Sequence, residues 1–302
     1  MKRILLFLLT NLCVLALLTL VARLTGADRI LAAQGTSTAQ LLIAAAVIGF
    51  AGSFISLAMS KWSARMMMGV RVITEPQNTQ EAWLTATVGR LAQEAGVGMP
   101  QVGIFESPEL NAFATGARRN HALVAVSSGL LDNMPGHDAE AVLGHELTHV
   151  ANGDMVTLAL IQGVVNTFVI FLARLIGSFV DSLLQSPEER RRGATGPAYF
   201  LIVLVLQIVL GLLANLVVLW FSRQREFRAD AGGARLAGRS QMIAALRFLQ
   251  RYGTGALPGK MAAFGISGAP TKFSRLFMTH PPLGERIAAL ESAEPSSAFA
   301  RR

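Results

Sequence analysis

The chain has 302 residues, of which 52% are hydrophobic and only 15% are charged, and its formal net charge is +8. This composition is too apolar for an ordinary soluble protein of this length and indicates a membrane protein. The positive charge does not point to nucleic-acid binding, because no basic patch is interleaved with aromatic residues. We therefore expect a lipid bilayer as a partner and no nucleic acid.

Four long runs without a charged residue lie along the chain. They are residues 4–22, 39–60, 155–173 and 199–221. A membrane-spanning helix needs about 20 apolar residues to cross a core of about 30 Å, so we predict four transmembrane helices. The third run contains the polar residues Gln162 and Asn166, and its alternative is a long apolar helix packed on the soluble part.

The first run follows a basic pair, Lys2 and Arg3, as the core of a secretory signal would. It is longer than such a core, and no convincing cleavage site follows directly, so we interpret it as a retained anchor. The single cysteine, Cys13, lies within it. An intrachain disulfide and a zinc site made of thiolates are therefore excluded.

Basic residues flank the runs unevenly. Lys61 and Arg65 follow the second run, and Arg223 and Arg225 follow the fourth. Cytoplasmic loops carry the excess of lysine and arginine, so both termini are predicted to be cytoplasmic. The arginine triplet at 190–192 runs against this topology, because it would lie outside, between the third and fourth runs.

The remaining sequence predicts a soluble part that is divided by the second pair of runs. A helix is expected at 79–95, ended by Gly96, and three short strands at 102–105, 110–116 and 122–126 form a small antiparallel sheet. The fold class is thus an α-rich α+β membrane protein with four transmembrane helices. Its expected segments are a first hairpin at 1–60, a first soluble part at 61–154, a second hairpin at 155–222 and a second soluble part at 223–302.

Residues 145–149 spell H-E-L-T-H, an H-E-x-x-H motif, within a predicted helix from about Asp138 to Ala151 that Gly153 ends. His145 and His149 are four residues apart and share one helix face, where two imidazoles can bind one zinc ion. Glu146 lies beside that face and can accept a proton from a water molecule, as the general base of metalloproteases does.

A catalytic zinc needs a third protein ligand. Glu226 and Asp230, four apart just after the fourth run, share a helix face. One carboxylate can bind the metal while the other accepts a hydrogen bond from a ligand histidine. A hairpin made of the third and fourth runs would return the chain to the side of the H-E-x-x-H helix.

This ordered set resembles the HtpX-type membrane zinc metalloproteases, gluzincins related to the CAAX prenyl proteases. The resemblance covers nearly the whole chain and rests on the segments 111–116, 145–149, 152–154, 226–230 and 280–281. It implies an endopeptidase of the cell inner membrane, with one zinc ion per chain and a cytoplasmic active site. Its substrates would be unfolded or misfolded membrane proteins, in stress response and quality control.

The resemblance also implies roles for single residues. His145, His149 and Glu226 would be the metal ligands, with Asp230 hydrogen-bonded behind them and Glu146 as the base. His280 would donate to the oxyanion, and Arg286 would hold substrate or carboxylates of the zinc site. Asn111, Ala112 and Phe113 would form an edge strand that pairs with extended substrate.

Two other functions fit parts of the pattern. An intramembrane protease would carry H-E-x-x-H within an apolar span, whereas here the motif precedes the third run. A zinc transporter or a membrane scaffold is the other alternative; a transporter would place ionisable ligands inside its spans, and these four runs carry almost none. Metal-assisted peptide hydrolysis is the function that we expect.

Overall fold

The structure is a computed structural model that describes residues 31–32, 37–186, 188, 196, 198–255, 278 and 280–293. The chain divides into two compact units, with boundaries between Ile55 and Ser56, between Leu158 and Ala159, and between Val218 and Leu219. The first predicted span (4–22) and the arginine triplet (190–192) lie outside the described residues. The other three predicted spans lie within them.

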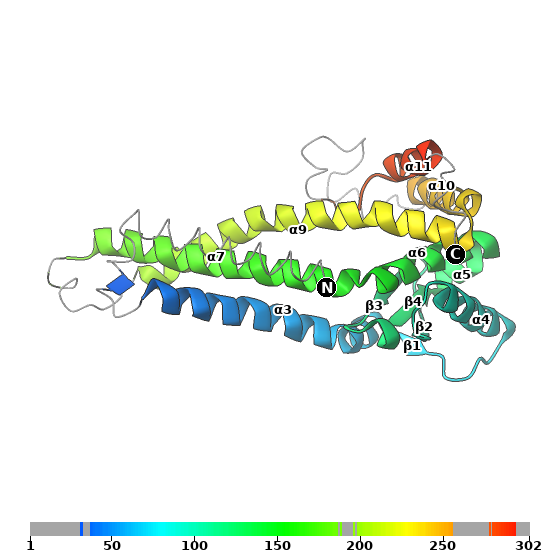
Figure 1. The fold of residues 1–302 in the computed structure, drawn as a ribbon, viewed down its shortest axis with the longest axis horizontal. Coiled ribbons are helices and arrows are strands. Elements are labelled where there is room, and N and C mark those ends of the chain that lie inside the picture. Colours follow the sequence, from blue (N-terminus) through cyan, green and yellow to red (C-terminus); the bar gives the residue numbers. More distant parts are fainter. Residues whose placement is uncertain are drawn as a thin grey trace. The chain divides into compact units, whose positions relative to one another are not determined.

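Three helices among the described residues are long and apolar enough to cross a membrane: α3 (Thr38–Met68), α7 (Asp154–Leu184) and α9 (Tyr199–Ala237), shown in Figure 1. Large apolar side chains stay exposed along α9, among them Phe200 and Leu212. A soluble protein would bury such a surface, whereas a lipid-facing helix exposes it. The predictions for the second, third and fourth runs are confirmed, and the fold is that of an α-rich membrane protein.

A four-stranded sheet lies at the centre of the second unit. Its order is β1-β2-β4-β3, and its strands are β1 (Arg71–Val72), β2 (Gln101–Phe105), β4 (Leu123–Ser127) and β3 (Ala112–Thr115). The predicted sheet is antiparallel throughout. In the structure β1 and β3 pair antiparallel with their neighbours, but β2 and β4 are parallel, so the sheet is mixed.

The parallel pair arises from the position of β4. All five residues of β4 are buried, so this strand takes a central place with both faces covered. The chain leaves β2, passes to the far edge as β3, and then returns between the two as β4. As a result β3 is an edge strand, hydrogen-bonded to β4 alone within the described part of the sheet.

Helices α4 (Thr79–Glu94) and α6 (Gly136–Asn152) cover one face of this sheet. Asn78 caps α4 by accepting a hydrogen bond from the backbone N–H of Glu81. Successive strand residues point to opposite faces, so one set joins the core beneath these helices and the other set a smaller cluster beside the end of α3. Short helices η1 (Arg119–His121) and α5 (Ser128–Asn133) flank β4.

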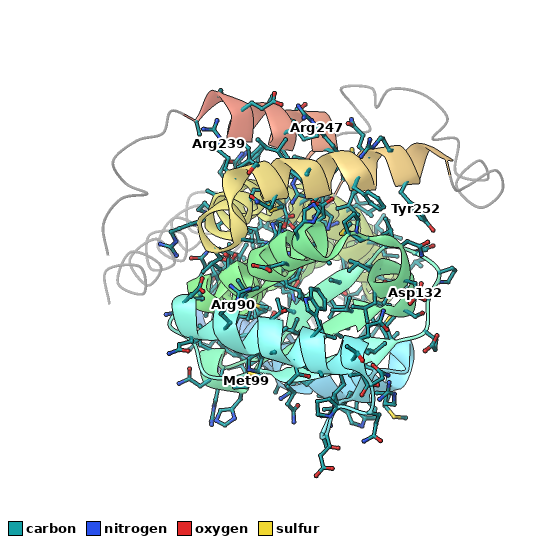
Figure 2. All side chains as sticks on the ribbon, turned by 90° about the vertical axis from the view of Figure 1, so that its right-hand side faces the viewer. Arg90, Met99, Asp132, Arg239, Arg247 and Tyr252 are labelled. Carbon is teal, nitrogen blue, oxygen red and sulfur yellow. The ribbon has the colours of Figure 1, made fainter. Side chains whose placement is uncertain are left out.

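Two later helices, α10 (Arg239–Gly255) and α11 (Leu283–Ser292), pack against each other, and α10 also packs on α6. Arg239 donates to the backbone oxygen of Glu291, and Arg247 forms an ion pair with the carboxylate of Glu291, each at 2.6 Å. Figure 2 labels both arginines on the side of α10 that meets α11. These contacts hold α11, which carries Arg286, in place.

Candidate metal centre

Helix α6 places the two motif histidines one turn apart on a buried face. Both rings are buried, and their Nε2 atoms lie 3.2 Å from each other. Two basic nitrogens buried at this distance cannot both carry a proton without repulsion. The pair is therefore arranged to share a cation.

Glu226 on α9 brings a carboxylate to the same point. It is fully buried, and its oxygens lie 3.5 Å from Nε2 of His145 and 3.4 Å from Nε2 of His149. These three residues form the group among the described residues that is able to hold a metal ion. The chain thus joins two candidate ligands on α6 to a third candidate ligand on α9.

The spacing of the two ring nitrogens fits a tetrahedral metal. Atoms bound to one zinc ion at about 2.0–2.1 Å with tetrahedral angles lie about 3.3–3.4 Å apart. The two Nε2 atoms lie 3.2 Å apart, close to this value, and each lies 3.4–3.5 Å from a different oxygen of Glu226, Oε2 for His145 and Oε1 for His149. In addition, Oε1 of Glu226 is buried and has no hydrogen-bond partner among the described residues, as expected of an atom that binds a metal.

Each histidine uses its other ring nitrogen to contact an aspartate. Nδ1 of His145 lies 2.9 Å from Asp230 on α9, and Nδ1 of His149 lies 2.7 Å from Asp154 at the start of α7. A carboxylate partner fixes the proton on Nδ1 and leaves Nε2 to bind a metal. The tautomer required for a metal ligand is thereby set in both rings.

Arg286 balances the negative charge of this site. Its Nε donates to Asp230 at 2.7 Å and its Nη2 to the other oxygen of Asp230 at 2.5 Å. Its Nη1 lies 3.6 Å from Glu226. All three side chains are buried, and a buried carboxylate requires such a partner. Arg286 therefore holds both carboxylates of the site in fixed positions.

The same contacts shift the pKa values of the site. Burial by itself lowers the pKa of His149, but its contacts with the carboxylates of Asp154 and Glu226 raise that pKa to about 9. Burial by itself raises the pKa of Glu226, but its close contacts with His145, His149 and His280 hold that pKa well below its usual range. Metal binding must displace the imidazole protons, so it releases protons to solvent.

Small residues allow α6 and α9 to approach closely at the site. A Cβ atom at Gly232 would overlap the side chain of Thr148, and one at Gly233 would lie 3.0 Å from the backbone nitrogen of His145. Real Cβ atoms rarely approach so closely, so a larger residue at either position would push the helices apart. The two glycines thus keep Glu226 and Asp230 within reach of the histidines.

The other predicted site residues lie in three different settings. Glu146 is half-buried on α6 and makes no hydrogen bond or ion pair with the described residues. His280 is exposed, and its Nδ1 lies 2.8 Å from Glu226. Asn111 precedes edge strand β3, which contains Ala112 and Phe113 and packs beside α6. Within the described part, no hydrogen bond or ion pair joins Asn111, Ala112 or Phe113 to the metal-site side chains.

Two features of the site are absent from our predictions. The first is the contact of Asp154 with His149. Asp154 directly follows the left-handed Gly153, and the available signal was an acidic residue just beyond an H-E-x-x-H helix. The second is the contact between Thr148 on α6 and Gly232 on α9, whose only signal in the sequence was the glycine pair at 232–233. Neither pattern identifies a partner until α6, α7 and α9 are placed.

Comparisons with known proteins agree with this geometry. A family described as Peptidase family M48 matches residues 78–294. A Protease HtpX homolog from Nitrosomonas eutropha is 61% identical, over 97% of this chain and 100% of its own length. Protease HtpX from Thioalkalivibrio sulfidiphilus is 58% identical, over 97% and 100% of the two chains. The crystal structure of S. mikatae Ste24p has a TM-score of 0.63 at 16% identity, covering 96% of this chain and 67% of that chain, which shows a shared fold.

Proposed function

The chain belongs to peptidase family M48, and on this premise we propose that it is a zinc-dependent membrane endopeptidase with His145, His149 and Glu226 as ligands. The observation that carries the proposal is the meeting of three buried side chains, His145, His149 and Glu226, whose ligand atoms all lie within 4.8 Å of one another. Two imidazoles and one carboxylate are the ligand set of many catalytic zinc sites. A zinc ion held by these three residues would supply Lewis-acid chemistry, polarising a peptide carbonyl and lowering the pKa of bound water.

Glu146 is the proposed general base. It lies on α6 between the two ligand histidines in sequence, half-buried and without a partner among the described residues. A carboxylate in this position accepts a proton from water and delivers it to the leaving amine. Nδ1 of His280 donates to the carboxylate of Glu226, and the doubly protonated ring is the form that would also donate from Nε2 to the oxygen of the tetrahedral intermediate.

Edge strand β3, with Asn111, Ala112 and Phe113, is the proposed substrate-binding element. An edge strand offers backbone N–H and C=O groups that pair with any extended peptide, regardless of its sequence. Such recognition suits unfolded chains, and it supports misfolded membrane proteins as substrates and a role in quality control. Arg286 acts behind the site by holding the carboxylates of Asp230 and Glu226.

The two alternative functions fit the geometry less well. An intramembrane protease would carry both histidines on a membrane-spanning helix. Helix α6, which carries them here, is not among the candidate membrane-spanning helices of the described chain. A transporter would hold the metal within its spans, whereas Glu226 follows the charge-free run 199–221 on α9. Both observations favour a protease site that borders the membrane.

Removal of the metal is expected to abolish proteolysis. The full-length protein, purified in detergent, should contain about one zinc ion per chain and should cut unfolded casein. Treatment with a strong chelator should stop cleavage, and stoichiometric zinc should restore it. Cleavage that continues after complete loss of metal would refute the proposed function. The control variant is His137→Ala, which removes an exposed histidine outside the site and should keep both zinc and activity.

The metal centre also supports a membrane topology. Asp154 at the start of α7 and Glu226 on α9 both contact His149, so both ends of the segment between them lie at one site. A few residues cannot carry a ligand across about 30 Å of bilayer, so this segment crosses twice or not at all. The basic flanks favour the cytoplasm of a cell with an inner membrane as the side of the active site.

Labelling of single cysteines tests this topology. In a Cys13→Ser background, cysteines are placed at the exposed positions Gln93, Ser186 and Ser240. An impermeant maleimide applied to intact cells should label position 186 and leave the other two protected until the cells are broken. Protection of position 186, with a labelled external control, would show that α7 and α9 do not span. Labelling at 93 but not 240 would contradict the metal centre itself.

A further inference from the structure

Asp154 lies at the junction between the H-E-x-x-H helix and the first helix of the second hairpin. Helix α6 ends at Gly153, whose backbone is left-handed (φ 67°, ψ 36°), and α7 begins with Asp154. This turn directs the chain back so that the carboxylate of Asp154 reaches Nδ1 of His149 at 2.7 Å. Only 3% of Asp154 is exposed.

Among the described side chains, the carboxylate of Asp154 contacts only that of His149. By contrast, Asp230 contacts both His145 and Arg286. An acidic residue at a helix N-terminus stabilises the helix through its charge even when it is exposed to solvent. That role requires neither burial nor contact with a metal ligand, so it does not account for the position of Asp154.

We propose that Asp154 is a positioning residue that orients His149 toward the metal and ties this ligand to the first turn of α7. The proposal rests on the proposed zinc protease function. The hydrogen bond keeps the proton on Nδ1, so that Nε2 faces His145 and Glu226. Because Asp154 is the first residue of α7, a rotation or shift of that turn moves the ligand.

Two substitutions separate this role from a merely structural one. Asp154→Ser retains a side chain suited to a helix N-terminus but is too short to reach His149. Asp154→Asn retains the shape and one acceptor oxygen but lacks the charge. Asp132→Asn, on the exposed surface of α5, is the matched control.

Each full-length variant is loaded with cobalt(II), whose visible absorption depends on ligand geometry, and metal affinity is measured by competition with a chelator. We expect Asp154→Ser to bind metal about 10- to 100-fold more weakly, with a changed cobalt spectrum. Asp154→Asn should lie between Asp154→Ser and the wild type, and kcat should fall more than KM changes. The control should match the wild type.

Wild-type affinity and spectrum in both Asp154 variants would overturn the proposal. A lower unfolding temperature without a change in affinity or spectrum would also overturn it, because it would show a helix-terminus role alone. If Asp154→Ser does not fold, the near-isosteric Asp154→Asn decides. Failure of the wild type to bind metal would instead refute the proposed function.

Discussion

Glu146→Gln is expected to leave the fold and the metal in place while slowing peptide hydrolysis by about 100- to 10,000-fold. Glutamine has nearly the same shape as glutamate but cannot accept a proton from water. Glu146 is not one of the three residues that form the metal group, so its loss leaves those ligands intact. The measurement is the rate of casein cleavage by the purified variant, together with its zinc content.

Glu140→Gln provides the control on the same helix. Glu140 forms a partly exposed ion pair with Arg90, away from the metal group, and such pairs contribute little to stability. The activity of Glu140→Gln should stay near that of the wild type. Cleavage by Glu146→Gln at the rate of the wild type would show that another group is the base. Loss of zinc from Glu146→Gln would show instead that Glu146 helps to hold the metal.

Glu226→Gln is expected to lose both the metal and the activity. The carboxylate of Glu226 is fully buried and faces His145, His149 and His280, so it supplies the negative charge that a divalent ion requires there. A neutral amide is a much weaker ligand, and the affinity should fall by more than the roughly 10- to 100-fold typical of residues behind the ligands. Zinc content after dialysis against a weak chelator measures the effect.

Asp230→Asn gives the comparison that distinguishes a ligand from its support. Asp230 contacts Nδ1 of His145 rather than the shared metal position, so its loss should cost about 10- to 100-fold in affinity. Asparagine is preferred to alanine, because Arg286 would otherwise lose its main partner inside the protein. Glu109→Gln, on the exposed surface, should have no effect. Equal zinc content in Glu226→Gln and the wild type would place the third ligand elsewhere.

The parts of this fold that the sequence predicted are those with a strong local signal. Long charge-free runs specify α3, α7 and α9, and Gly153 marks the end of α6. The spacing of His145 and His149 fixes their shared face from helix geometry alone. The pair Glu226 and Asp230 was found as a helix face, but only the structure shows that Glu226 meets both histidines while Asp230 contacts His145 from behind.

The features that escaped prediction depend on contacts between distant segments. Strand β1 has two residues, too few for an alternating pattern, and exists because it pairs with β2. The parallel pairing of β2 with β4 follows from the burial of β4, which the order of the strands does not reveal. Asp154 gains its partner only through the left-handed turn at Gly153.

The division of the metal centre between α6 and α9 has a consequence during biosynthesis. The ribosome completes both histidines before it makes the hairpin, and Glu226 follows only after α7 and most of α9. At about 5–20 residues per second, this delay is on the order of several seconds. During this time the nascent chain holds two of the three proposed metal ligands, and we expect it not to cut its neighbours. If Glu226 is the third ligand, proteolytic competence arises only after most of α9 has been made, and a separate inhibitory propeptide is not required to keep the unfinished chain inactive.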